Sequence, residues 1–165
     1  RASEEKTFWE RAEKMTENYL RWRKSNKNKF IESEAYIEYK FAGITLNGKI
    51  DWIEQDKNGD YEIVDFKTSK KAISQNKAAV DLQLHIYAKL IEKEYGKLPT
   101  KATLYFLNED KKVTVKIEKN KVKNILENEL KPIIEKILRE EFEATPEHNK
   151  CFFNCDYSDI CSFKK

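Results

Sequence analysis

Three successive segments in the first half of the chain alternate apolar and polar side chains, and this pattern restricts the fold more than any other feature. A period of two is typical of β-strands, and it extends over Phe30 to Lys40, Ile44 to Glu54 and Tyr61 to Lys67. Asn58 and Gly59, which readily adopt positive φ, separate the last two segments and predict a tight turn. We therefore expect three antiparallel strands that lie side by side in the order of the sequence.

Helices are predicted before and after these strands. Apolar residues at spacings of three and four predict helices over residues 4–25, 79–95 and 122–138, the last with a kink or a break at Pro132. Residues 102–107 and 113–117 predict a second hairpin. The expected fold class is α/β, with a central mixed sheet of about five strands flanked by helices.

The composition suits one domain. The chain has 165 residues, 39% of them hydrophobic, and is long enough to bury a core. We expect a single domain over residues 1–165, with a cysteine-bearing tail at 146–165. Charged residues make up 37% of the chain but leave a net charge of only +3, which permits a nucleic-acid partner without requiring one.

Targeting signals are not visible in the sequence. No apolar run reaches the roughly 18 residues of a membrane span, and no signal-peptide pattern occurs, so we expect a cytoplasmic protein with no membrane partner. The chain starts at Arg1 rather than Met and soon enters a predicted helix. We therefore also expect it to be a fragment that lacks upstream residues.

Two carboxylates and an ammonium group are expected to converge at the ends of neighbouring strands. Alternation places Asp65 and Lys67 on one face of the third strand, and a turn at Asn58 and Gly59 brings Asp51 beside Asp65. Two adjacent carboxylates repel each other, and a divalent cation relieves that repulsion. Oxygen ligands favour Mg²⁺ or Mn²⁺, which often bind phosphate as well, so the pattern indicates a phosphodiester substrate.

A surface salt bridge between Asp65 and Lys67 is the plain alternative, and the motif alone does not exclude it. Further residues favour a functional site. Gln83 and Tyr87 lie four apart on one face of the following helix, where a glutamine near the carboxylates can hold water or a phosphate oxygen. Glu34, on the preceding strand, is a weaker candidate for the same acidic cluster.

The segments GKID, VDFKTS and QLHIY together resemble the PD-(D/E)xK nuclease superfamily, in the branch that includes RecB and AddB nuclease domains and the CRISPR adaptation nucleases. The resemblance covers most of the chain and implies a restriction-endonuclease-like core. It implies a metal site formed by two carboxylates and one main-chain carbonyl, those of Asp51, Asp65 and Phe66. The residues that match the family's catalytic positions are Asp51, Asp65, Lys67, Gln83 and Tyr87.

Two positions depart from the family pattern. Trp52 follows Asp51 where members often have Arg, and alternation places it on the opposite face, so we expect altered packing rather than lost chemistry. Members of this branch also use an upstream His as a metal ligand, but no His precedes His85 here. A helix turns His85 about 160° to 200° away from Gln83 and Tyr87. We therefore expect it to be exposed or simply packed.

Three cysteines near the C-terminus, Cys151, Cys155 and Cys161, resemble the C-terminal part of the iron–sulfur nucleases of this branch. There, one upstream Cys and three downstream Cys hold a 4Fe-4S cluster, and the fourth Cys is not in this chain. A zinc site with His148 is a second alternative. A disulfide between Cys151 and Cys155, or three free thiols, is the third.

A basic segment follows Lys67. Lys70, Lys71 and Lys77 are candidates for contacts to the phosphate backbone of DNA, although a solvated loop has the same composition. These residues would bind DNA without reading its bases.

The function we expect is a Mg²⁺- or Mn²⁺-dependent DNA nuclease, an exonuclease more than an endonuclease, that trims single strands or DNA ends. Its partners would be DNA and a fused or associated helicase in a repair machine. One alternative is an inactive nuclease fold that only binds DNA or a protein, and another is a nuclease of CRISPR spacer acquisition. The fold is common to all three and does not decide between them.

Overall fold

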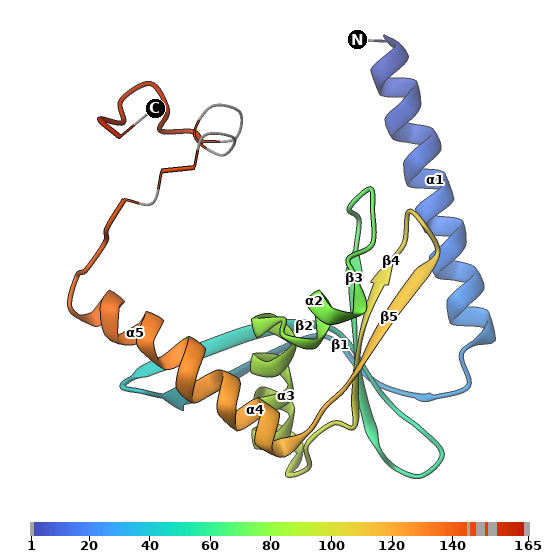
Figure 1. Cartoon of the computed structure of the whole chain (residues 1–165). Helices are drawn as coiled ribbons and strands as arrows, with labels where there is room; N and C mark the ends of the chain where they lie inside the picture. Colours follow the sequence, from blue (N-terminus) through green and yellow to red (C-terminus); the bar gives the residue numbers. More distant parts are fainter. Residues whose placement is uncertain (1, 145, 148–150, 152–154, 164–165) are drawn as a thin grey trace. The chain divides into compact units, whose positions relative to one another are not determined.

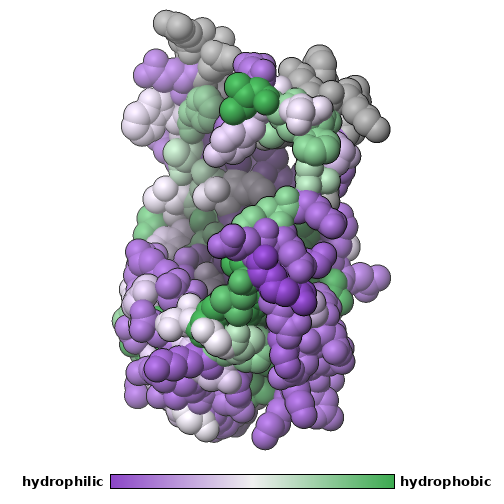
Figure 2. Space-filling view, turned by 90° about the vertical axis from the view of Figure 1, so that its left-hand side faces the viewer, coloured by the Kyte–Doolittle hydropathy of each residue, from purple (hydrophilic) through white to green (hydrophobic). Residues whose placement is uncertain are grey.

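The computed structural model describes residues 2–144, 146–147, 151 and 155–163. The chain divides into two compact units, Arg1–Pro132 and Ile133–Lys165, and each is described by itself. The first unit contains the whole sheet and the candidate site. Hydrophilic side chains cover most of the face shown in Figure 2, in keeping with a chain that is 37% charged. None of the helices within the described residues is long and apolar enough to span a membrane.

One five-stranded mixed sheet forms the centre of the first unit (Figure 1), which confirms the predicted α/β fold class. Its strands lie in sequence order, and the single parallel pair is β3 with β4. The predicted three-strand meander and second hairpin are both present, with small changes of boundary. The strands are β1 (Lys29–Phe41), β2 (Ile44–Gln55), β3 (Tyr61–Lys67), β4 (Lys101–Phe106) and β5 (Lys111–Lys116).

The segment between β3 and β4 contains two helices rather than the one predicted over residues 79–95. The two are α2 (Gln75–Ala79) and α3 (Leu82–Tyr95). Asp81 separates them, because its side chain accepts a hydrogen bond from Leu84 N at 3.1 Å and so caps the start of α3. The helix ends at Gly96, where φ is 71°, a conformation that glycine adopts without strain.

The last helical segment is irregular before Pro132 rather than simply kinked there. It consists of α4 (Lys119–Ile125), a π-helical turn (Leu126–Leu130) and α5 (Lys131–Leu138). Pro132 thus lies in the first turn of α5, where a missing backbone N–H costs little. The wider π-helical turn that precedes it absorbs the change in hydrogen bonding.

Helix α1 (Ala2–Ser25) covers one face of the sheet through an aromatic cluster. Trp22 is 7% exposed and packs with Trp52, Val64 and Tyr105, and its ring centre lies 5.4 Å from that of Trp52. The expectation that Trp52 packs on this face is confirmed. The opposite face of β3 is turned toward α3, whose Leu84, Leu90 and Ile91 are fully buried.

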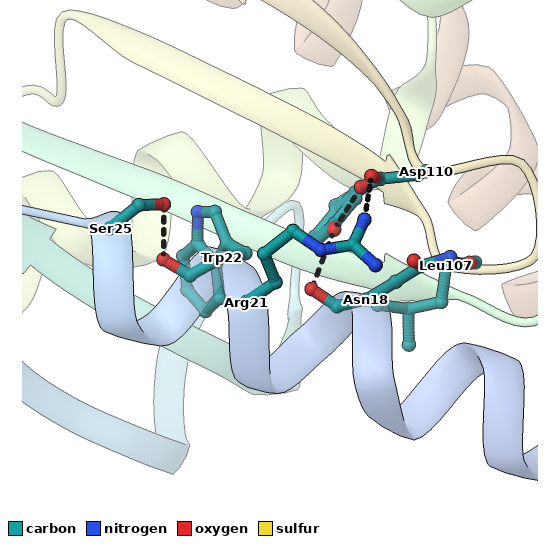
Figure 3. Close-up of polar contacts among 7 residues, drawn as sticks. Asn18, Arg21, Trp22, Ser25, Leu107 and Asp110 are labelled. Carbon is teal, nitrogen blue, oxygen red and sulfur yellow. Dashed lines mark hydrogen bonds and ion pairs between the residues drawn. The ribbon is translucent and has the colours of Figure 1, made fainter.

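Polar contacts fix α1 to the turn between β4 and β5 (Figure 3). Asn18 Nδ2 donates a hydrogen bond to Leu107 O at 2.7 Å, and Arg21 Nη1 lies 3.1 Å from Asp110 Oδ2. The Tyr105 hydroxyl donates to Asp110 Oδ1 at 2.5 Å and lies 3.1 Å from Asn18 O. The orientation of α1 about its own axis is therefore defined.

A buried carboxylate binds the segment that connects α1 and β1. Glu54 is only 3% exposed, and it accepts hydrogen bonds from Asn26 Nδ2 at 2.5 Å, Asn28 Nδ2 at 2.7 Å and Trp52 Nε1 at 2.9 Å. Three donors therefore replace the water that this carboxylate loses on burial.

We predict that Glu54→Ala lowers the free energy of unfolding by about 3 kcal/mol, because three buried donors lose their acceptor. Urea denaturation measures this change. Glu38→Ala, on an exposed part of β1, is the control and should change stability by no more than about 0.5 kcal/mol. Equal costs for the two variants would contradict the structural role of Glu54.

Candidate active site

The pairing of β2 with β3 stops one residue short of the two predicted metal-binding acids. The antiparallel register ends at Trp52 and Val64, so Asp51 and Asp65 would form the next opposed pair. Instead, Asp51 Oδ2 accepts a hydrogen bond from Phe66 N at 2.8 Å. A carboxylate thus takes the place of a strand-to-strand hydrogen bond where the two strands separate.

Asp65 carries a buried carboxylate. Its side chain is 4% exposed, and its Oδ2 lies 2.7 Å from Nζ of Lys67, whose side chain is 33% exposed. Apart from this ammonium, Asp65 Oδ2 has no polar partner among the described residues. A buried carboxylate oxygen with so few partners is a candidate for binding a ligand.

The pKa of the Asp65 carboxyl is raised above its ordinary value. Burial is the main cause, and the negative charge of Asp51 adds to it, whereas the Lys67 ammonium opposes it. Burial thus outweighs the effect of Lys67 on this pKa. The burial of the Asp65 side chain, which is 4% exposed, distinguishes the pair from an ordinary surface salt bridge.

A chain of hydrogen bonds holds Lys67 from the side of α3. Lys67 Nζ donates to Gln83 Oε1 at 2.9 Å, Gln83 Nε2 donates to the Tyr87 hydroxyl at 3.0 Å, and that hydroxyl donates to Lys49 O at 3.0 Å. The predicted pairing of Gln83 and Tyr87 on one helix face is present. The structure adds that Gln83 contacts the ammonium group, so the α3 motif orients Lys67.

Gly48 makes this arrangement possible, and the sequence analysis did not assign it a role. A Cβ atom at this position would lie 2.6 Å from Leu90 Cδ1 and 2.9 Å from Tyr87 Cε1, closer than carbon atoms approach in proteins. The absence of a side chain therefore lets α3 approach β2. Its place directly before Lys49 and three residues before Asp51, within GKID, was the available signal.

Glu34 is engaged by another cation. Its carboxylate forms an ion pair with Lys49 Nζ, and its φ of 55° is unusual for a residue in a strand. Glu34 lies beside Asp51 in the lining of an open pocket of about 360 Å³, which also includes Tyr19 and Phe66. A role for Glu34 in metal binding stays a prediction, as does the role of the Phe66 carbonyl.

The remaining candidates lie apart from the acids. His85 is fully buried, with Nδ1 2.7 Å from Asp81 O, so it is packed rather than exposed. Lys70 and Lys71 are exposed in the loop after β3, and Lys77 is exposed on α2. Their contacts to DNA stay a prediction.

The three cysteines of the second unit are half-buried free thiols, with no disulfide among them. His148, the remaining ligand of the zinc alternative, lies outside the described residues. Within the described part of the chain, no three His, Cys, Asp or Glu side chains form a group that could hold a metal ion. The cluster and zinc alternatives therefore stay predictions.

A second pocket, of about 350 Å³, lies between β1, α3 and α4 and is remote from the acids. Its lining includes Lys89 and Glu92, whose charged groups pair with each other at 2.6 Å. Neither Asp51 nor Asp65 is part of this lining.

Comparison with known proteins decides the family. The family model of the PD-(D/E)XK nuclease superfamily matches residues 3–162. The chain belongs to the PD-(D/E)XK nuclease superfamily. A solved structure titled "Crystal structure of SSO0001" is similar in fold, with a TM-score of 0.54 and 16% sequence identity over 92% of this chain and 68% of that chain. A search of curated proteins found no match.

Membership of the PD-(D/E)XK superfamily indicates a nuclease, with DNA as the substrate. Members usually use Mg²⁺ or Mn²⁺, and the site suits such an ion in one respect. Mg²⁺ keeps several of its waters and needs only one or two protein carboxylates. Asp51 and Asp65, at the next opposed positions of β2 and β3, would supply these.

We predict that Asp65→Asn unfolds at the same or a higher temperature than the unmodified protein, at pH 7 with EDTA. The pKa of Asp65 is higher in the native state than in the unfolded state. Native stability therefore falls as the pH rises through the interval between the two values, and a neutral Asn removes this cost.

Asp56→Asn is the control of opposite sign in the same thermal melts. Hydrogen bonds from the backbone N–H groups of Asp60 and Asn58 lower the pKa of Asp56, so its ionised form stabilises the turn at pH 7. This variant should melt at a lower temperature. A drop of several degrees for Asp65→Asn would contradict the assignment of Asp65 as an undercompensated charge.

Proposed function

We propose that this domain is a Mg²⁺- or Mn²⁺-dependent DNA nuclease that hydrolyses phosphodiester bonds at Asp51, Asp65 and Lys67. The observation that carries this proposal is the buried carboxylate of Asp65, which lies beside Asp51 and 2.7 Å from an ammonium group that Gln83 also holds. A purely structural pair would be better compensated, because a buried charge without partners destabilises the native state.

The cation would be held by the carboxylates of Asp51 and Asp65 and by the carbonyl of Phe66. When bound, it would polarise the phosphate and lower the pKa of a coordinated water. Asp51 is already fixed in direction, since its Oδ2 accepts the hydrogen bond from Phe66 N. The protein therefore presents oxygen ligands whose orientation does not depend on the ligand that arrives.

Lys67 would act on the reacting phosphate. Its ammonium is held between Asp65 Oδ2 at 2.7 Å and Gln83 Oε1 at 2.9 Å, and its side chain is one-third exposed, so part of it remains open to a substrate. From there it would orient the attacking water and offset the negative charge that develops on the phosphate in the transition state.

Gln83 and Tyr87 would be positioning residues. Gln83 uses its oxygen for Lys67 and its nitrogen for Tyr87, and the Tyr87 hydroxyl is tied to Lys49 O, two residues before Asp51. The ammonium and the Asp51 strand are thus linked through α3. A rigid link of this kind keeps the charged groups in place for the reaction.

The biological setting belongs to the proposal as well. We infer exonuclease action on single strands or DNA ends, with the exposed Lys70, Lys71 and Lys77 contacting phosphates, as part of a helicase–nuclease or repair protein. The cysteines would then serve an iron–sulfur cluster with a structural role. No group of three acids, His or Cys that could hold a metal is present among the described residues, and Glu34 is paired with Lys49, which favours one alternative, a domain that binds DNA without cutting it.

Cleavage of end-labelled DNA distinguishes these functions. We predict that the unmodified protein cuts with Mg²⁺ or Mn²⁺ but not with EDTA, and that Lys67→Ala lowers the rate by about 100-fold or more, because a charge-stabilising group is lost. Lys116→Ala, which removes an exposed ammonium on β5, should cut at the unmodified rate. Equal rates for Lys67→Ala and the unmodified protein would refute the site, and metal-independent binding without any cutting would favour the binding-only domain.

A further inference from the structure

Helix α1 exposes an aromatic side chain on the same side as its buried residues. Phe8 is 69% exposed. A helix turns about 100° per residue, so Phe8 and Tyr19, eleven residues apart, differ by only about 20° around the axis and lie about 16 Å apart along it. Phe8 therefore continues the packing side of α1 into the N-terminal half, which extends past the β4–β5 hairpin (Figure 1).

Phe8 lies on the flank of α1 that is turned toward the candidate site. Asn18 and Arg21, on one flank, contact the turn between β4 and β5 (Figure 3). Tyr19, on the other flank, packs edge-on against Phe66 of β3 with ring centres 5.4 Å apart. Tyr19 also lines the pocket of about 360 Å³ beside Asp51. Because Phe8 shares the flank of Tyr19, it lies on the side of β2 and β3.

One turn of helix from Phe8, α1 is anchored to the site loop. Arg11 Nη2 donates a hydrogen bond to the main-chain oxygen of Thr68, the residue after Lys67. Asn108 Nδ2 in turn donates to Lys70 O at 3.0 Å and holds the same loop on the β4–β5 turn. The distance between Phe8 and the site is therefore constrained by contacts on both sides of the loop.

The charges around this face suit a polyanion. Lys14 lies about 60° from Arg11 around the helix, and Lys70 and Lys71 are exposed in the anchored loop. Of the glutamates of α1 whose side chains the structure describes, Glu10, Glu13 and Glu17 lie about 140° or more from Phe8 around the helix, and Glu5 lies about 60° from it. Most of the acidic side of the amphipathic helix is thus turned away from Phe8.

We propose that this stacking face of α1, defined by Phe8, Arg11 and Tyr19, binds unpaired bases of the DNA strand that enters the site. Phe8 stacks on one base, Arg11 and the loop lysines neutralise phosphates, and the pocket beside Tyr19 accepts the base next to the scissile phosphate. An exposed ring beside basic residues is how proteins hold single strands without reading sequence. That the bound strand leads into the site rests on the proposed nuclease function, whereas the binding of a single strand to this face does not.

Paired bases are stacked inside a duplex and do not offer their faces to a side chain. The stacking face therefore predicts a preference for single strands that depends on the ring of Phe8. A protein segment docked on the same face would need apolar contact but not an aromatic ring. Replacing the ring of Phe8 with an apolar side chain that is not aromatic therefore distinguishes a bound single strand from a bound protein segment.

The test is fluorescence anisotropy of a labelled single-stranded oligonucleotide with the full chain in EDTA, where metal-dependent cleavage is absent. Phe8→Leu keeps an apolar side chain and removes the ring, and it should weaken binding by about fivefold or more, the lower end of one lost stacking interaction. Phe8→Trp should restore the affinity. Binding to a duplex of equal length should change less than about twofold in both variants.

Trp9→Leu is the matched control. Trp9 has the same exposed fraction as Phe8, 69%, but lies about 100° from Phe8 and about 160° from Arg11, the residue that contacts the site loop. It should bind the single strand like the unmodified protein. Equal losses for Trp9→Leu and Phe8→Leu, or no loss for Phe8→Leu, would overturn the proposal.

Failure of this proposal is distinguishable from failure of the proposed function. Metal-dependent cutting by the unmodified protein, together with unchanged single-strand binding in Phe8→Leu, would refute the stacking face and support the nuclease function. Ring-dependent binding without cutting would support the stacking face in a domain that only binds DNA.

Discussion

The buried ion pair between Asp65 and Lys67 is the interaction around which the candidate site is arranged. The Asp65 carboxylate is buried at the end of β3, where β2 no longer pairs with its neighbour, and a single ammonium from Lys67 faces it at 2.7 Å. Asp51 raises the pKa of the same group rather than relieving its charge. Burying a carboxylate in this way costs native stability at neutral pH, and such costs are common at functional sites.

The surrounding fold holds this site open. Gly48 admits α3 close to β2, and α3 in turn carries Gln83 and Tyr87 to Lys67. On the other face, Trp22 anchors α1 to the sheet. The two helices thus pack on opposite faces of the sheet, at the strands that carry Asp51 and Asp65.

Most of the fold and the central acids were predictable from the sequence, because local rules determined them. The turn at Asn58 fixes the register, and Asp51 and Asp65 stand seven residues on either side of it. The start of α3 was missed because the cap at Asp81 was outweighed by helix-forming residues before it. The role of Gly48 and the contact of Gln83 with Lys67 depend on how α3 packs on β2, which no local pattern contains. The π-helical turn likewise follows from packing.

The most direct measurement is calorimetric titration of Mn²⁺ into the metal-free protein at neutral pH. The account predicts binding to the unmodified protein that Asp51→Asn and Asp65→Asn each weaken by tenfold or more, since each removes a charged ligand. Lys67→Ala should bind Mn²⁺ at least as tightly as the unmodified protein, because the competing ammonium is gone. Undiminished binding by Asp65→Asn, or no binding by the unmodified protein, would contradict the central claim that the paired carboxylates form a cation site.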